Sequence, residues 1–148
     1  MPQKIIVFST SFLDELLTHP PEEGRARALL EEAAERNNLE LEFRCGRSPL
    51  VPMTAEELEG ATAVIADLEV YDAAVLSAVG VKNGGSLGLI SRYGVGYNSV
   101  DIKAAREAGI RVANTPGANS LPTAEWAVAT LLDIAGRRIP HHARAGSG

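Results

Sequence analysis

Short apolar runs alternate along this chain with segments whose apolar residues recur at helical spacing. The runs are bounded by turn residues, which is typical of strands. They cover residues 4–9, 39–44, 61–67, 87–91 and 110–115. Nearly continuous apolar runs indicate strands of a parallel sheet, whereas 39–44 alternates apolar and polar residues and predicts a half-exposed edge strand. The alternation of strands and helices predicts an α/β fold with a doubly wound parallel sheet.

The segments between the runs have recognisable helix ends. They cover residues 22–37, 54–60, 72–80, 100–109 and 121–138. Thr54 and Glu57 have the spacing of a capping box, which predicts a short helix that ends at Gly60. Gly109 stands where a glycine in the left-handed conformation commonly ends a helix. Pro122 stands in the first turn of the last helix, where its missing N–H costs little.

The composition is that of one globular domain, with 148 residues, 45% of them hydrophobic and 22% charged. The net charge of −5 and the scattered basic residues argue against nucleic acid or an anionic membrane as a partner. The first apolar run is interpreted as a strand rather than a signal peptide, so we expect a cytoplasmic protein. The single cysteine, Cys45, excludes an internal disulfide. His19, His141 and His142 lack the neighbours that a metal site needs, so no metal is expected.

A glycine pair marks the loop between the strand at 87–91 and the following helix. In parallel sheets ligands bind at the carboxyl ends of the strands, which directs attention to this loop. Gly94 and Gly96, with Val95 between them, would let a ligand approach the backbone closely. The N–H groups near a helix N-terminus, with the positive charge of Arg92, favour a small anion such as a carboxylate. A tight turn from strand to helix is the alternative interpretation.

The same loop lacks two features of a dinucleotide-binding fingerprint. Ser99 stands where the third glycine of that motif belongs. The acidic residue expected at the end of the next strand is also absent, because that strand leads into residues 114–117, Asn-Thr-Pro-Gly. The loop therefore fits a single small anionic group better than a pyrophosphate.

The string from Arg92 to Asp101, RYGVGYNSVD, and the later string NTPGANS, which ends at Ser120, resemble the D-isomer-specific 2-hydroxyacid dehydrogenases. The phosphoglycerate dehydrogenase branch of that family is the most similar. The resemblance implies an NAD-dependent oxidoreductase with a flavodoxin-like substrate-binding domain and a Rossmann domain. It implies that residues 1–120 are the substrate-binding domain and that 121–148 are an inter-domain helix and a truncated tail.

The resemblance also implies what this part of such an enzyme does. The substrate would be a small 2-hydroxy or 2-oxo acid, NAD would be bound mainly by the absent domain, and the intact protein would be a homodimer. The backbone of Gly94, Val95 and Gly96 would bind the substrate carboxylate, with Val95 also near the nicotinamide. Asn119 would lie at the cleft between the domains. No catalytic residue is expected in this chain, so alone it should show no dehydrogenase activity.

Two charged residues bear on the choice of substrate. In phosphoglycerate-type relatives Arg92 would contact the substrate phosphate, whereas an acid such as Asp67 beside the substrate would repel it. Asp67 therefore favours a non-phosphorylated hydroxy acid. Structural roles remain open, since Arg92 could pair with a surface carboxylate, Asp67 could be solvated at a strand end and Asn119 could cap a helix.

Two other functions remain open at this point. The chain could be a stand-alone domain that binds a small carboxylate or has a regulatory role and that does not catalyse a reaction. It could also be a signalling receiver domain in which Asp67 accepts a phosphoryl group. That function needs an acidic pair for Mg²⁺ after the first strand, where residues 9–12 read Ser-Thr-Ser-Phe.

Overall fold

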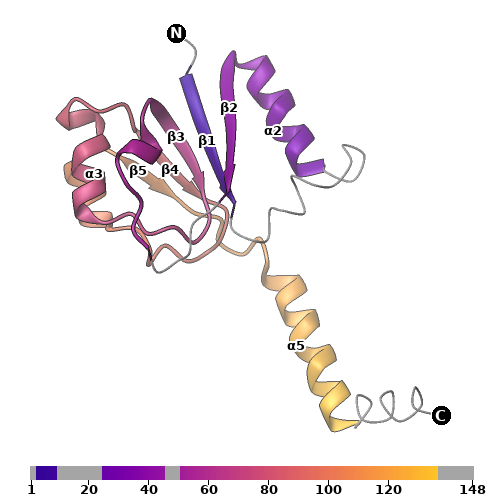
Figure 1. Ribbon diagram of the computed structural model, residues 1–148. Coiled ribbons are helices and arrows are strands. Elements are labelled where there is room, and N and C mark those ends of the chain that lie inside the picture. Colours follow the sequence, from indigo (N-terminus) through magenta and orange to yellow (C-terminus); the bar gives the residue numbers. More distant parts are fainter. Residues whose placement is uncertain (1–2, 10–24, 46–50, 137–148) are drawn as a thin grey trace. The chain divides into compact units, whose positions relative to one another are not determined.

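The computed structural model describes residues 3–9, 25–45 and 51–136 (Figure 1). Contacts divide the chain into two compact units, Met1–Thr115 and Pro116–Gly148, and each is described by itself. Several features named above lie outside the described residues: the loop at 10–12, His19, His141, His142 and the predicted helix ends at 22–24 and 137–138.

The first unit is built on a five-stranded sheet in which all neighbouring strands are parallel. Its strands are β1 (Gln3–Ser9), β2 (Leu39–Cys45), β3 (Ala61–Ala66), β4 (Leu89–Arg92) and β5 (Arg111–Ala113). The order β2-β1-β3-β4-β5 is the flavodoxin-like one. The predicted α/β, doubly wound parallel fold is confirmed, and so is the edge position of the strand at 39–44.

Helices cover both faces of this sheet. The described helices of the first unit are α2 (Arg25–Arg36), α3 (Ala73–Val79) and α4 (Ile102–Glu107), with the short 3₁₀ helices η1 (Glu56–Leu58) and η2 (Val81–Asn83). The connection from β1 to β2 runs across the sheet in the opposite direction to the connection from β3 to β4. Because such crossovers are right-handed, α2 and α3 lie on opposite faces, as Figure 1 shows.

The core lies on the face that α3 and α4 cover. Alternate residues of the central strands point to this face and are 0–2% exposed: Ile6, Phe8, Val64, Ala66 and Ile90. Leu76 of α3 and Ala105 of α4 pack in the same cluster. This packing fixes the carboxyl ends of β3 and β4, from which the candidate site is built.

The predicted helix ends are present. The backbone N–H and hydroxyl of Thr54 both donate to Glu57 Oε2 at 2.8 Å, and the Glu57 N–H donates back to Thr54 Oγ1 at 3.4 Å. Gly60 and Gly109 have φ values of +73° and +79° and end η1 and α4 in the left-handed region. Local sequence therefore sets these boundaries.

The second unit contains one described helix, α5 (Ser120–Ala135), with Pro122 in its first turn. Asn119 occupies the N-cap position, but its side chain makes no capping hydrogen bond. The large apolar side chains of α5 are 59–70% exposed: Leu121, Trp126, Val128, Leu131, Leu132 and Ile134. Within the described ranges, the structure contains no helix with the length and apolar character needed to cross a bilayer.

Candidate functional site

The backbone carbonyls of the glycine loop, defined here as residues 93–97, are held from within the first unit. The carbonyl of Gly94 accepts from the Thr115 N–H at 3.3 Å. The carbonyl of Val95 accepts from Asn114 Nδ2 at 2.8 Å. The carbonyl of Gly96 accepts from Arg92 Nε at 3.0 Å. Three consecutive acceptors are therefore occupied, from β4 and from the residues that follow β5.

The N–H groups of the same three residues are free within the described part of the chain. No hydrogen bond joins the N–H of Gly94, Val95 or Gly96 to another described residue. A Cβ at Gly94 or Gly96 would meet nothing within 4 Å, and neither glycine has a positive φ. Val95 is 51% exposed. Neither packing nor turn geometry requires these glycines, and this favours the interpretation that a ligand approaches the backbone here.

The following helix does not contribute to this loop as predicted. Helix α4 begins only at Ile102, and the carboxylate of Asp101 accepts from the Ala104 N–H at 2.9 Å. The N-terminus of α4 is thus separated from Gly96 and is already capped by a negative charge. The expectation that a helix dipole supports the glycine loop is wrong, because the chain folds into a loop and a turn before the helix starts.

Arg92 is buried, with 4% exposure, although it carries a charge. Among the described residues Arg92 forms no ion pair, and its Nε donates to the Gly96 carbonyl, so this part of the chain gives no support to the interpretation that Arg92 pairs with a surface carboxylate. Its Nη1 is also buried and has no hydrogen-bond partner. Arg92 therefore stabilises the conformation of the glycine loop through its hydrogen bond to the Gly96 carbonyl.

Acidic groups lie beside Arg92, at the end of the neighbouring strand. Ala66 of β3 pairs with Arg92 of β4, and Asp67 follows directly. Asp67 is half-buried, and its N–H donates to Glu69 Oε2 at 2.8 Å. Burial raises the pKa of Glu69, which is 0% exposed, and hydrogen bonds from the backbone N–H groups of Glu69 and Asp67 and, to a smaller extent, the charge of Arg92 oppose that rise. Burial and a hydrogen bond with Asp67 both raise the pKa of Tyr93.

The structure brings most of the predicted residues together. Arg92, the glycine loop and Asp67 gather at the carboxyl ends of β3 and β4, whereas Asn119 belongs to the second unit. Reasoning from the sequence missed Glu69 and Asn114. Their positions just after strands were a signal, but the hydrogen bonds that they make could not be read from the sequence. No three His, Cys, Asp or Glu side chains gather as a metal site within the described ranges.

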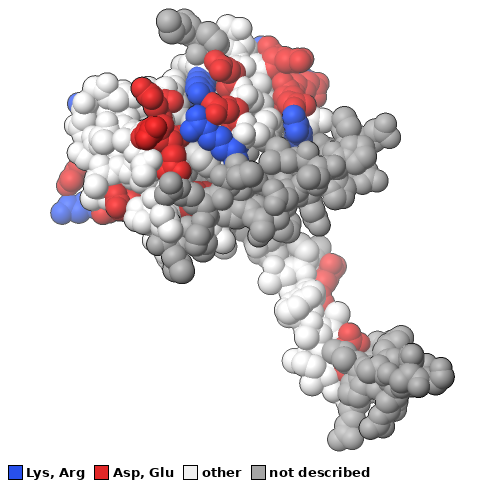
Figure 2. Space-filling view, viewed as in Figure 1, with Lys and Arg blue, Asp and Glu red and all other residues white. Residues whose placement is uncertain are grey.

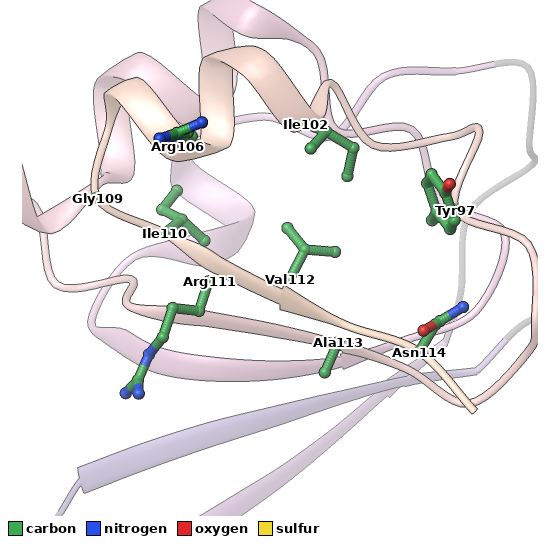
Figure 3. A pocket seen from close by; sticks show the side chains of 9 residues that line it. All are labelled: Tyr97, Ile102, Arg106, Gly109, Ile110, Arg111, Val112, Ala113 and Asn114. Carbon is green, nitrogen blue, oxygen red and sulfur yellow. The ribbon is translucent and has the colours of Figure 1, made fainter. Parts of the chain in front are cut away.

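A cavity of about 670 Å³ lies between α4 and β5 (Figure 3). Ile102, Ile110 and Val112 project into it, and Arg111 points away from it. Tyr97 and Asn114 line the end opposite Gly109, so the cavity borders the glycine loop there. On the face of the molecule seen in Figure 2, acidic side chains gather in separate groups, one of them over α2, and the basic side chains between them form no broad patch.

Comparisons with known proteins show which family and which fold this chain is similar to. The model of the family "D-isomer specific 2-hydroxyacid dehydrogenase, catalytic domain" matches residues 16–135. The D-3-phosphoglycerate dehydrogenase of Archaeoglobus fulgidus is 36% identical over 129 residues, which are 81% of this chain and 22% of that protein.

Two solved structures show the same fold. The TT0316 protein of Thermus thermophilus has a TM-score of 0.73 and 31% identity, and the match covers 99% of this chain and 41% of that one. The NAD⁺-bound 3-phosphoglycerate dehydrogenase of Entamoeba histolytica has a TM-score of 0.67 and 24% identity, with 90% and 39% coverage. The chain thus spans 22% of the curated relative's length and about two fifths of the length of these two structures.

Proposed function

The chain belongs to the D-isomer-specific 2-hydroxyacid dehydrogenase family, and we propose that it is the substrate-binding part of an NAD-dependent member. In this proposal residues 1–120 bind the substrate and 121–148 lead toward the domain that binds NAD. The glycine loop carries the proposal. The carbonyls of Gly94, Val95 and Gly96 accept hydrogen bonds from within the first unit, and the N–H groups of the same three residues have no partner among the described residues and are left for an external acceptor.

The proposed role of the loop is to hold the carboxylate of a small 2-hydroxy or 2-oxo acid. Backbone N–H groups that are fixed in advance stabilise an anion without reorganising when it binds. Bound NAD supplies or accepts the hydride in such enzymes. The family resemblance implies that Val95, which is half exposed in the loop, contacts the nicotinamide, and this contact is part of the proposal. This chain supplies no catalytic residue in the proposal, so it binds substrate without turnover.

The charges around the loop favour a non-phosphorylated substrate. Arg92 is buried against the Gly96 carbonyl, so its guanidinium is not presented to a phosphate. Asp67 is only half-buried at the same strand ends and would repel a phosphate. We therefore favour a small acid such as lactate or glyoxylate over phosphoglycerate. Asn119 remains a proposed residue of the cleft between the two domains of the intact enzyme, as the family resemblance implies.

Titration of the isotope-labelled chain with D-lactate, followed in its amide NMR spectrum, tests the proposal. We expect the amide signals of Gly94, Val95 and Gly96 to move in a saturable manner. Lactamide, which has the same shape without the charge, should move them little. Phosphoglycerate should bind no more tightly than glycerate. Unmoved loop signals, or equal shifts with lactamide, would refute the carboxylate site.

A further inference from the structure

A buried cation holds the glycine loop in place. Arg92 lies at the end of β4 with 4% exposure, and its Nε donates to the Gly96 carbonyl at 3.0 Å. Its Nη1 is buried without a hydrogen-bond partner. A buried charge is costly unless an opposite charge lies near it. The hydrogen bond between Arg92 and the Gly96 carbonyl is therefore stable only if a negative charge lies close enough to balance the guanidinium.

The carboxylate of Glu69 lies at the end of the adjacent strand. Ala66 of β3 pairs with Arg92, and the N–H of the next residue, Asp67, donates to Glu69 Oε2 at 2.8 Å. This hydrogen bond folds the Glu69 side chain back to the strand end. Glu69 is 0% exposed, and its Oε1 has no hydrogen-bond partner. A buried guanidinium at the end of β4 and a buried carboxylate that follows the end of β3 thus lie at neighbouring strand ends, each with a buried polar atom that has no partner among the described residues.

We propose that Glu69 is a positioning residue for the glycine loop, because its buried carboxylate balances Arg92 and so keeps that guanidinium on the Gly96 carbonyl. The inference rests on the proposed function of the loop. Asp67 is a weaker candidate for this role, because it is half-buried and hydrogen-bonds with Tyr93. Burial raises the pKa of Glu69, and the nearby charge of Arg92 is the smallest of the effects that act on it, in the lowering direction.

The variant Glu69→Gln removes the charge and keeps an oxygen that can accept the Asp67 N–H. The readout is the NMR signal of the Arg92 Nε–H, which should exchange slowly with solvent in the unmodified chain because it is bound to Gly96. We expect its exchange to become at least tenfold faster in Glu69→Gln. The matched control is Ser99→Ala, which removes another buried, unpartnered polar atom without changing any charge. It should leave the exchange rate unchanged.

Affinity for D-lactate gives a second readout, in a double-mutant cycle with Arg92→Met. If Glu69 acts through Arg92, each single variant weakens binding about fivefold or more and the double variant is no weaker than Arg92→Met alone. Additive losses, or an unchanged Nε–H signal in Glu69→Gln, overturn the inference. Absence of D-lactate binding in the unmodified chain contradicts the proposed function instead, and the Nε–H exchange then still decides the role of Glu69.

The unmodified chain provides a test that needs no substitution. Lowering the pH protonates Glu69, whose pKa is raised above 4.5, and should release the Arg92 Nε–H before the ordinary carboxylates titrate. Among the described residues, the charged and titratable groups that interact with Glu69 and Arg92 are Asp67, Tyr71 and Tyr93. The pKa values of both tyrosines are raised, so they stay neutral. An Arg92 Nε–H chemical shift that stays at its hydrogen-bonded position below about pH 4 would overturn the inference even if Glu69→Gln failed to fold.

Discussion

Gly94 has room for a side chain, so an alanine there separates binding from folding. Its φ is not positive, and a Cβ would meet nothing within 4 Å. We expect Gly94→Ala to leave the free energy of unfolding unchanged or to raise it by up to about 1 kcal/mol. The new methyl group would occupy space beside the exposed amides, so the affinity for D-lactate should fall at least tenfold, or about 1.4 kcal/mol. Urea denaturation and NMR titration measure the two effects.

Gly60→Ala is the matched control for that variant. A Cβ at Gly60 also meets nothing within 4 Å, but the residue has a φ of +73°. The strain should lower the free energy of unfolding by about 1 kcal/mol and leave the affinity for D-lactate unchanged. If Gly94→Ala instead lost stability like Gly60→Ala and kept its affinity, the glycine loop would be a turn and not a binding site.

Single residues also mark where reasoning from the sequence stops. The pair Gly94 and Gly96 could be predicted, because glycine after a strand is a local signal. The burial of Arg92 could not, since arginine is usually exposed and its burial depends on residues that are distant in the sequence. Asn114 was missed for the same reason, because its bond to the Val95 carbonyl joins residues that are distant in the sequence.

At the level of elements, the sequence predicts nearly all of the described fold. The five strands and five helical segments appear in the predicted order, because each has a local pattern or end signal. The boundaries differ where partners decide them. The strand predicted from residue 87 begins at Leu89, because Leu87 forms an isolated bridge with Gly80 instead. Strand β5 is restricted to Arg111–Ala113, since only these residues pair with β4.

Gly80 joins two elements by close packing rather than by its backbone freedom. It follows α3, and a Cβ there would lie 2.5 Å from both the Cβ and the carbonyl oxygen of Ala108, which follows α4. Gly80→Ala should therefore separate the ends of these helices and lower the free energy of unfolding by about 2–3 kcal/mol. Thermal and urea denaturation would measure this loss.

Gly84→Ala provides the comparison within the same connection. Gly84 has a φ of +88° and open space around it, so this variant tests backbone strain alone and should lose only about 1 kcal/mol. A smaller loss in Gly80→Ala than in Gly84→Ala would mean that α3 and α4 can move apart easily. The close approach of the two helices would then not limit stability.

For the whole molecule, an ion pair between β1 and β2 makes the free energy of unfolding depend on pH in acid solution. Hydrogen bonds from Arg44 and Lys4 lower the pKa of Glu42 to about 2 from 4.5. A lowered pKa in the folded state gives stability that is present above pH 4.5 and is lost as the pH falls toward 2. Because the side chain of Glu42 is 36% exposed, solvent screening limits this contribution to about 1 kcal/mol or less.

Glu42→Gln should therefore destabilise the chain in neutral solution, and this difference should shrink in acid. Urea denaturation of both proteins at about pH 6.5 and about pH 3 measures it. Glu40→Gln, on the same strand, is the control, and its effect should not depend on pH in this way. A difference for Glu42→Gln that stays constant between the two pH values would contradict the role given to the ion pair.

The exposed apolar side chains of α5 predict how copies of the whole chain interact. Helix α5 exposes large apolar side chains, with Leu131 and Trp126 at 69% and 70% exposure, and such surfaces are typical of interfaces. We expect two chains to associate through α5, in line with the homodimer that the family resemblance implies. Leu131→Glu would place a charge in this interface and should yield monomers in sedimentation equilibrium at concentrations where the unmodified chain is dimeric. Leu29→Glu, a similarly exposed leucine of α2 in the first unit, should leave association unchanged, and equal effects of the two substitutions would place the contact elsewhere.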